Sequence, residues 1–228
     1  MVSIPCDLCL FDLDGTLVLS TKAIEKGWES VFSEYNVNYN MEEFLQNNHG
    51  VRTGDSFDRW LPQIDNTNSK AGDEFEKRIS IEYADLAEPV PGAPQLLNSI
   101  PKDHWLVVTS GTPLLANGWF SKVLAKFGVT KPEIFVTGQS VSNGKPHPEP
   151  YLKGLALWTE KYGKKPVHPI VFEDAPNGIK AGTASGCTVI GIASSFGKEV
   201  LQAAGATYVV QDLSHVKFHD NTLDIDNL

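Results

Sequence analysis

Short runs of apolar residues alternate with longer mixed stretches through most of the chain after residue 90. The runs are apolar at every position, which is typical of strands buried on both faces of a parallel sheet. Several mixed stretches open with Pro or Asn and close at Gly, as helices do. Repeated strand–helix units predict an α/β fold with a doubly wound parallel sheet. The expected strands are 106–108, 134–136, 170–172, 189–192 and 208–210, and the expected helices are 114–127, 149–162, 177–185 and 198–204.

An apolar run at residues 8–13 fits the same series but lies far from the next run at Trp105. The chain between them is too long for one crossover connection, and it shows helical periodicity with no convincing strand. We therefore expect a core of residues 1–18 and 89–228 with an inserted helical domain at 19–88. The helical patterns of the insert are 24–35, 41–46, 56–61 and 74–85.

Two further stretches border this scheme. Residues 88–92, Glu-Pro-Val-Pro-Gly, are rich in Pro and Gly and predict a stiff hinge between insert and core. Residues 215–228 are polar, and we expect them to lie on the surface or to fray.

The overall composition is that of an ordinary folded protein. The chain has 228 residues, of which 41% are hydrophobic and 21% charged, which fits one domain carrying a smaller insert. A formal net charge of -9 disfavours a nucleic-acid binder, since affinity for the phosphate backbone comes from clustered Lys and Arg.

No apolar stretch is long enough to predict a membrane span or a secretion signal. The three cysteines cannot form a closed set of disulfides, and their number fits a reducing compartment. Cys6 and Cys9 form a C-x-x-C that leads into an apolar strand, which favours packing over redox or zinc chemistry. We expect a cytoplasmic monomer.

Two carboxylates lie two residues apart at the end of the first apolar run, in the motif Asp-Leu-Asp-Gly-Thr at residues 12–16. An Asp-Gly turn explains Asp14 but leaves Asp12 unpaired in an apolar segment. Since residues i and i+2 share a face of a strand, Asp12 and Asp14 either repel each other or share a cation. The pair predicts a cation site.

A second acidic pair, Glu173 and Asp174, ends the run at 170–172 in the same way. Alone, it could favour the N-terminus of the following helix. Together the two pairs predict a site for a hard cation, and Mg²⁺ suits ligands that are all oxygen with no supporting His or Cys cluster.

Two more strand ends carry groups that suit a phosphate. Thr109 and Ser110 follow the run at 106–108 and offer hydroxyls and free amides, while Lys145 lies in a Gly-Lys-Pro loop and supplies a point charge. In an open parallel sheet, ligands bind outside the carboxyl ends of the strands. All four motifs are expected at such ends.

The order Asp, Thr, Lys, acidic pair resembles the four motifs of the haloacid dehalogenase superfamily over the whole chain. The resemblance implies that Asp12 is a nucleophile, Asp14 a general acid and then base, and Asp12, Asp14 (through its backbone carbonyl) and Asp174 ligands of Mg²⁺. Thr109 and Lys145 would bind the phosphate, with Ser110 as a weaker contributor. Glu173 would either bind the metal or support the site from behind.

The insert resembles the helical cap of this superfamily, which closes over small substrates. Its His-Gly-Val-Arg-Thr segment at residues 49–53 makes Arg52 the best candidate to contact substrate, because a guanidinium can hydrogen-bond phosphate or sugar hydroxyls in a fork, with His49 a weaker candidate. The combined motifs resemble the fungal phosphatases of glycerol phosphate and 2-deoxyglucose 6-phosphate. The expected function is Mg²⁺-dependent hydrolysis of a small sugar or polyol phosphate.

Two alternatives remain at this stage. A sugar phosphomutase would use the same phospho-aspartate, although related β-phosphoglucomutases use a cap histidine where this chain has Ile24. Many relatives also carry an Asp where this chain has Leu19 before Ser20. A non-enzymatic phospho-accepting signalling domain shares acidic pairs, Thr and Lys, but such domains resemble a different motif order and lack a large cap.

Overall fold

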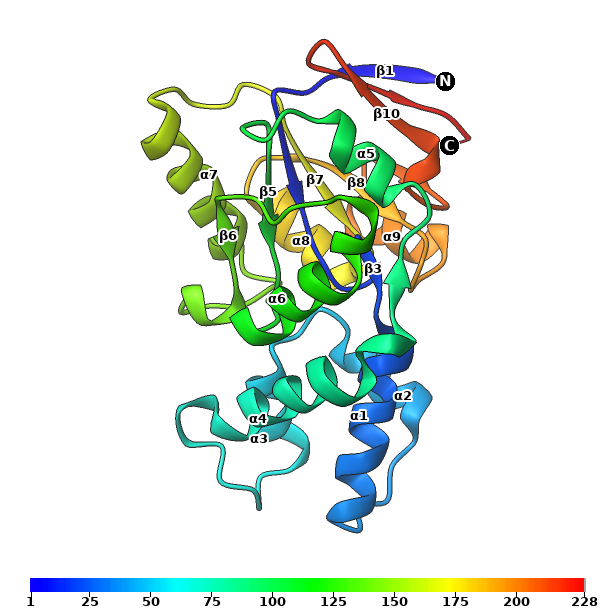
Figure 1. Ribbon diagram of the computed structural model, residues 1–228, viewed down its shortest axis with the longest axis vertical. Helices are drawn as coiled ribbons and strands as arrows, with labels where there is room; N and C mark the ends of the chain where they lie inside the picture. Colours follow the sequence, from blue (N-terminus) through cyan, green and yellow to red (C-terminus); the bar gives the residue numbers. More distant parts are fainter. Residues whose placement is uncertain (228) are drawn as a thin grey trace.

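A six-stranded parallel sheet forms the centre of the protein in the computed structural model, which describes residues 1–227 (Figure 1). The strand order is β6-β5-β2-β7-β8-β9, so the chain moves outward on one side of β2 and then on the other. The predicted doubly wound sheet is confirmed. The strands are β2 (Leu8–Phe11), β5 (Trp105–Val108), β6 (Phe135–Val136), β7 (Pro169–Glu173), β8 (Thr188–Ile192) and β9 (Tyr208–Val210).

Successive side chains of the central strands point to opposite faces of the sheet and into two separate apolar clusters. Phe11 and Phe172 are register partners on one face, where their rings stack with centroids 4.4 Å apart. Leu10 and Val171, one residue earlier on each strand, belong to the cluster on the other face. This double burial explains why the strands are apolar at every position.

Helices cover both faces. α5 (Ala93–Ser99) and α6 (Pro113–Lys122) contribute to the cluster that contains Phe11, while α7 (Glu149–Tyr162), α8 (Pro176–Ala184) and α9 (Lys198–Ala204) contribute to the other. The four predicted helices are found, although the first ends at Lys122 and continues only as a 3₁₀ turn. Helix α5 was not predicted.

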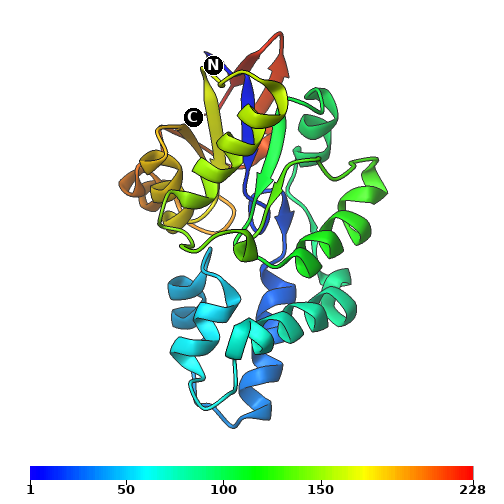
Figure 2. The same cartoon turned by 90° about the vertical axis from the view of Figure 1, so that its left-hand side faces the viewer.

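Between β3 (Val18–Leu19) and β4 (Glu88–Pro89) the chain forms a group of helices at the carboxyl end of the sheet (Figures 1 and 2). β3 and β4 pair antiparallel, so the expectation of no strand at the two ends of this segment is wrong. The division at residues 18/19 and 88/89 itself stays a prediction. The helices are α1 (Thr21–Glu34), α2 (Met41–Asn48), α3 (Thr53–Trp60) and α4 (Lys70–Arg78), and α4 continues as a π-helical turn (Ile79–Tyr83).

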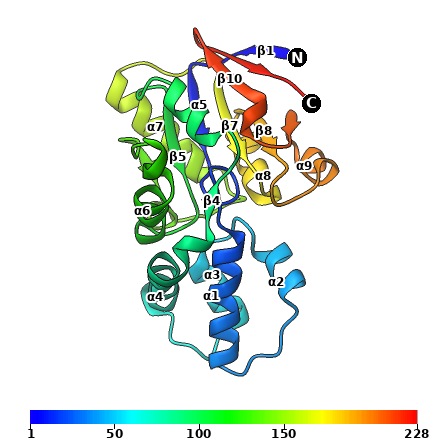
Figure 3. The ribbon, with the colours of Figure 1, turned by 45° about the vertical axis from the view of Figure 1, so that its right-hand side comes forward.

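The helices of residues 19–88, called the cap below, have an aromatic core of their own. α2 and α4 flank α1 (Figure 3), and Trp28 of α1 is 3% exposed. Ring contacts to Trp28 have centroid distances between 4.4 and 5.6 Å, as expected for favourable aromatic pairs. The cap is therefore held by side chains from all four helices. The rings around Trp28 are Phe32, Phe44, Phe57 and Phe75.

A small antiparallel sheet of order β1-β11-β10 brings the two chain ends together. It consists of β1 (Val2–Pro5), β10 (Val216–His219) and β11 (Thr222–Ile225). Of the two alternatives expected for residues 215–228, surface position or fraying, fraying is wrong for the described part, and Leu228 lies outside it. Leu223 and Ile225 are fully buried. Apolar residues alternate with polar ones in β10 and β11, which places one face of this sheet on the core.

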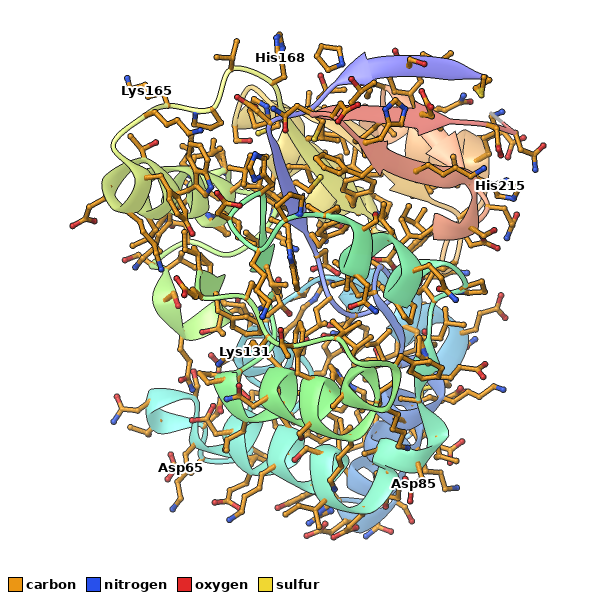
Figure 4. All side chains as sticks on the ribbon, turned by 45° about the horizontal axis from the view of Figure 1, so that its top comes forward. Asp65, Asp85, Lys131, Lys165, His168 and His215 are labelled. Atoms are coloured by element: carbon orange, nitrogen blue, oxygen red, sulfur yellow. The ribbon has the colours of Figure 1, made fainter. Side chains whose placement is uncertain are left out.

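In Figure 4 the labelled Asp65 and Asp85 extend from the periphery of the cap. Among residues 1–227, no helix is long and apolar enough to cross a membrane.

We expect Trp28→Ala to lower the free energy of unfolding by about 3 to 5 kcal/mol, because it removes a large buried ring from a closed aromatic cluster. Urea unfolding followed by circular dichroism measures the change. Tyr35→Ala, at the exposed end of the same helix, should lose less than about 1 kcal/mol. Equal losses in the two variants would contradict a packed cap core.

Candidate active site

The four predicted motifs lie together at the carboxyl edge of the parallel sheet. Asp12 follows β2, and Thr109 follows β5. Glu173 is the last residue of β7, and Asp174 is the next residue in the chain. Lys145 reaches the same place from the loop between β6 and α7. β2 lies between β5 and β7, so Asp12 occupies the point where the order of the strands reverses.

Lys145 is the centre of this group. Its Nζ donates to Asp12 Oδ1 at 2.5 Å, to Glu173 Oε1 at 2.7 Å and to the carbonyl oxygen of Val108 at 3.0 Å. The ammonium group is therefore fully hydrogen-bonded although it is buried. Burial lowers the pKa of Lys145, but the attraction of Asp12 and Glu173 outweighs it and raises the pKa above its usual value.

The carboxylate of Glu173 binds Lys145 and two further donors of the protein. Its Oε1 also accepts from Tyr151 Oη at 3.0 Å, and its Oε2 accepts from the backbone N–H of Ala175 at 3.1 Å. Gly178 lies against this carboxylate so closely that a Cβ at position 178 would overlap it. These contacts favour a supporting position behind Lys145 over direct metal binding, and the role of Glu173 stays a prediction.

The surroundings of Asp12 shift its pKa in opposite directions. Burial raises the pKa of Asp12 well above its usual value, Lys145 opposes that rise, and Glu173 and Asp174 add to it. One lysine thus faces several carboxylates, and a further cation would lower the repulsion among them.

Asp14 lies apart from Lys145 and is held by two neutral donors. Its Oδ1 accepts from Ser20 Oγ and from Trp119 Nε1, each at 2.7 Å. Burial raises the pKa of Asp14 more than these two hydrogen bonds lower it. A carboxyl group in this setting keeps its proton to higher pH than an exposed aspartic acid, which suits a general acid.

Asp174 presents a buried oxygen with no hydrogen bond. Thr16 Oγ1 donates to Oδ1 at 3.2 Å, whereas Oδ2 accepts none. His49 Nε2 lies 3.2 Å from Oδ2, within ion-pair distance although outside hydrogen-bond geometry. Burial lowers the pKa of His49, but Asp174 reverses the effect, and the pKa is raised overall.

The residues present fit a divalent cation of the Mg²⁺ kind. Asp12, Glu173 and Asp174 each offer a carboxylate oxygen, and these oxygens lie within 4.8 Å of one another. Asp174 Oδ2 lacks a donor, and the donor set is entirely oxygen. Both oxygens of Glu173 accept hydrogen bonds from the protein, whereas one oxygen of Asp12 and one of Asp174 accept none from residues 1–227, so Asp12 and Asp174 are the carboxylates best placed to hold the metal.

Thr109 and Ser110 follow β5 at the same edge of the sheet. Thr109 Oγ1 accepts from the backbone N–H of Gly111 at 3.0 Å. Ser110 Oγ donates to the carbonyl oxygen of Gly50 in the cap at 2.7 Å, so this side chain joins core and cap. Both residues line the same cavity as Asp12 and Asp14.

Arg52 does not line that cavity. Its Nε and Nη2 bind the two carboxylate oxygens of Asp55 at 2.8 and 3.0 Å, and Nη1 donates to the carbonyl oxygen of Ser142 at 3.3 Å. The guanidinium thus joins the cap to the core loop before Lys145. Substrate binding by Arg52 stays an untested prediction, and its position favours a role in holding the cap.

The cavity between core and cap has a volume of about 80 Å³ and contains one acidic residue that sequence reasoning missed. Glu76 of α4 is 1% exposed, and its Oε2 accepts from the backbone N–H of Thr112 at 2.6 Å. Its Oε1 accepts from Thr53 Oγ1. Glu76 lies between Gly72 and Ile79 on the buried face of the helix that begins with α4. An acidic residue on the face that the helical pattern predicts to be buried is the feature of the sequence that could have identified it.

Comparison with known proteins defines the class of this site. A family model described as haloacid dehalogenase-like hydrolase matches residues 9–192, and the chain belongs to this family. The resemblance seen in the four motifs is thereby confirmed.

The chain is 43% identical over 234 residues to 2-deoxyglucose-6-phosphate phosphatase 1 of Saccharomyces cerevisiae, covering 97% of this chain and 94% of that protein. It is 36% identical to glycerol-1-phosphate phosphohydrolase 2 of the same yeast, with 95% and 86% covered. A hydrolase from Pseudomonas syringae shares the fold, with a TM-score of 0.75, 24% identity and coverage of 91% and 94%.

We expect the stability of the protein to report the ionisation of Glu76. Burial raises its pKa from 4.5 to about 7, against the hydrogen bonds from Thr53 and Thr112. The folded state therefore holds this proton more tightly than the unfolded chain. The free energy of unfolding should fall as the pH rises through that interval, by up to about 1.4 kcal/mol per pH unit.

Urea unfolding of the wild type and Glu76→Gln across this interval measures the effect, because the difference between the two profiles isolates Glu76. Glu74→Gln, exposed on the same helix, should keep the wild-type slope. Parallel profiles for the wild type and Glu76→Gln would contradict the raised pKa.

Proposed function

We propose that this protein is a Mg²⁺-dependent phosphatase that hydrolyses monophosphate esters of sugars or polyols. The observation that carries the proposal is the placement of Asp12, Asp14, Lys145 and Asp174 around one edge of the sheet. The names of the yeast relatives, a 2-deoxyglucose-6-phosphate phosphatase and a glycerol-1-phosphate phosphohydrolase, support the choice of substrate class.

Asp12 is the nucleophile in this proposal. Lys145 binds its Oδ1, and the hydrogen bonds described for residues 1–227 reach the Asp12 carboxylate through that oxygen alone. The other oxygen can therefore attack phosphorus. The bond from Asp12 to phosphorus forms while the ester P–O bond breaks, which gives a phospho-aspartate and an alcohol.

Asp14 moves the proton in both halves of the reaction. It gives its proton to the oxygen of the departing alcohol and then accepts one from the water that attacks the phospho-aspartate. Attack by that water breaks the bond between phosphorus and Asp12 and releases inorganic phosphate. Because its pKa is raised, the Asp14 carboxyl group more readily keeps the proton that the first half of the reaction requires.

Lys145 and the hydroxyls of Thr109 and Ser110 are proposed to bind the phosphoryl oxygens. Lys145 and Ser110 would each exchange a hydrogen bond made within the protein for one to the phosphoryl group. Asp12, Asp174 and the backbone carbonyl of Asp14 would hold Mg²⁺, which supplies positive charge to neutralise the phosphoryl group. The cap at residues 19–88 would exclude water from the cavity. His49 and Gly50 bring the cap to the catalytic edge through Asp174 and Ser110.

The named relatives disfavour the signalling-domain alternative, because they are phosphatases. A phosphomutase would transfer the phosphoryl group to a second sugar hydroxyl and would need a bisphosphate activator. Release of inorganic phosphate from a single monophosphate ester, without activator, separates the two reactions.

Asp12→Asn should abolish phosphate release, because it removes the nucleophile, whereas Asp14→Asn should slow turnover by about 10²- to 10⁴-fold. Asp14→Asn should still bind phosphate. Phosphate release from glycerol phosphate and deoxyglucose 6-phosphate measures both effects. Normal turnover by Asp12→Asn would exclude covalent catalysis at this residue.

Removal of divalent metal with a chelator should lower phosphate release by roughly a hundredfold or more, and Mg²⁺ should restore it. The same addition should raise the melting temperature, because a cation bound to the folded state offsets repulsion between Asp12 and Asp174. Asp174→Asn should weaken both responses. Full activity in the chelated protein would reject the proposed metal site.

A further inference from the structure

The cavity contains an acidic group that none of the proposed catalytic steps uses. Glu76 lies in its wall on the cap side, while Asp12 and Asp14 lie on the core side. Its two hydrogen-bond donors, Thr53 and Thr112, are both neutral. In the part of the chain that is described, neither a hydrogen bond nor an ion pair joins Glu76 to a cationic side chain.

Glu76 has unused capacity to accept hydrogen bonds. Each carboxylate oxygen can accept about two hydrogen bonds, and each oxygen of Glu76 receives one from the protein. A buried carboxylate gains stability from further donors, since burial raises its free energy. The raised pKa of Glu76 agrees with this lack of donors.

Two other polar residues of the cap wall, Asn48 and Ser56, are already occupied. Asn48 Oδ1 accepts from Ser56 Oγ at 2.9 Å and from Trp60 Nε1 at 3.1 Å. Asn48 Nδ2 donates to the carbonyl oxygen of Phe44 at 2.7 Å. Glu76 is the one carboxylate that the cap contributes to the described lining, and it keeps room for further donors.

The charges around the cavity also restrict what can enter. Asp12, Asp14 and Glu76 line it, together with His49, and among its described lining residues there is no Lys or Arg. His49 lies against Asp174, and Lys145 forms an ion pair with Asp12, so both basic groups face the core carboxylates. A second anionic group of the substrate placed next to Glu76 would therefore meet a carboxylate that no cation neutralises directly.

We propose that Glu76 selects the alcohol part of the substrate, by accepting hydrogen bonds from its hydroxyl groups and by repelling a second negative charge. The inference rests on the proposed phosphatase function and deepens it. It makes neutral polyols and sugars the favoured leaving alcohols. Carboxylated alcohols and bisphosphates are disfavoured.

Three monophosphate esters of similar size test the proposal: glycerol phosphate, propyl phosphate and phosphoglycolate. The wild type should show a kcat/KM for glycerol phosphate at least roughly tenfold above the other two values, because a charge-assisted hydrogen bond contributes about that factor. Glu76→Gln should lower the ratio of glycerol phosphate to propyl phosphate roughly tenfold, and it should raise the ratio of phosphoglycolate to propyl phosphate.

Glu74→Gln is the matched control, since it removes an exposed carboxylate from the same helix and should leave both ratios unchanged. Equal losses on all three esters in Glu76→Gln would mean that Glu76 only holds the cap against Thr112, and this result would overturn the inference. If Glu76→Gln does not fold, the wild type decides. Hydrolysis of propyl phosphate as fast as glycerol phosphate would also overturn the inference.

The result separates the two proposals. A wild type that releases phosphate from none of the three esters, nor from a simple aryl phosphate, would reject the phosphatase function itself. A wild type that releases phosphate with equal preference rejects only the role of Glu76.

Discussion

The ion pair of Lys145 with Asp12 and Glu173 is the interaction on which the arrangement of the site depends. It joins three strand ends, because Lys145 also binds the carbonyl oxygen at the end of β5. A buried ion pair is stable only when its remaining donors and acceptors are satisfied. Tyr151 and the N–H of Ala175 satisfy Glu173, so the helices on one face of the sheet support a charge at its edge.

This arrangement also divides the carboxylates into two kinds. Asp12 and Glu173 accept hydrogen bonds from the Lys145 ammonium group, whereas, among the described residues, Asp14 and Glu76 accept side-chain and backbone hydrogen bonds from neutral donors only. The difference comes from the neighbours of each carboxylate. A single cation thus determines which groups suit a nucleophile and which suit proton transfer or recognition of hydroxyls.

The sequence predicted the parallel sheet well because strands buried on both faces have a continuous apolar pattern. The site motifs were predictable for a related reason, since polar residues directly after such strands must meet at one edge of the sheet. The C-terminal hairpin was missed because composition was considered over the whole segment, which hid the alternation of Leu223 and Ile225 with polar neighbours. Helix α5 is short and has a weak pattern of its own.

Contacts between segments distant in sequence were harder to predict from the sequence. Arg52 suggested a substrate contact by residue type, but its hydrogen bond to the carbonyl oxygen of Ser142 depends on how the cap meets the core. Glu76 drew no attention for the opposite reason, because an acidic residue in a helix is usually solvated. Only the packing of α4 against Thr112 shows that it is buried.

The pairing of β3 with β4 has a consequence for how such a protein can change over time. Val18 is opposite Pro89, so the chain leaves the core and returns to it at neighbouring points. An insert attached in this way can be lengthened, shortened or replaced by another fold without disturbing the sheet beneath it. The catalytic edge and the surface that recognises the alcohol can therefore evolve as separate modules.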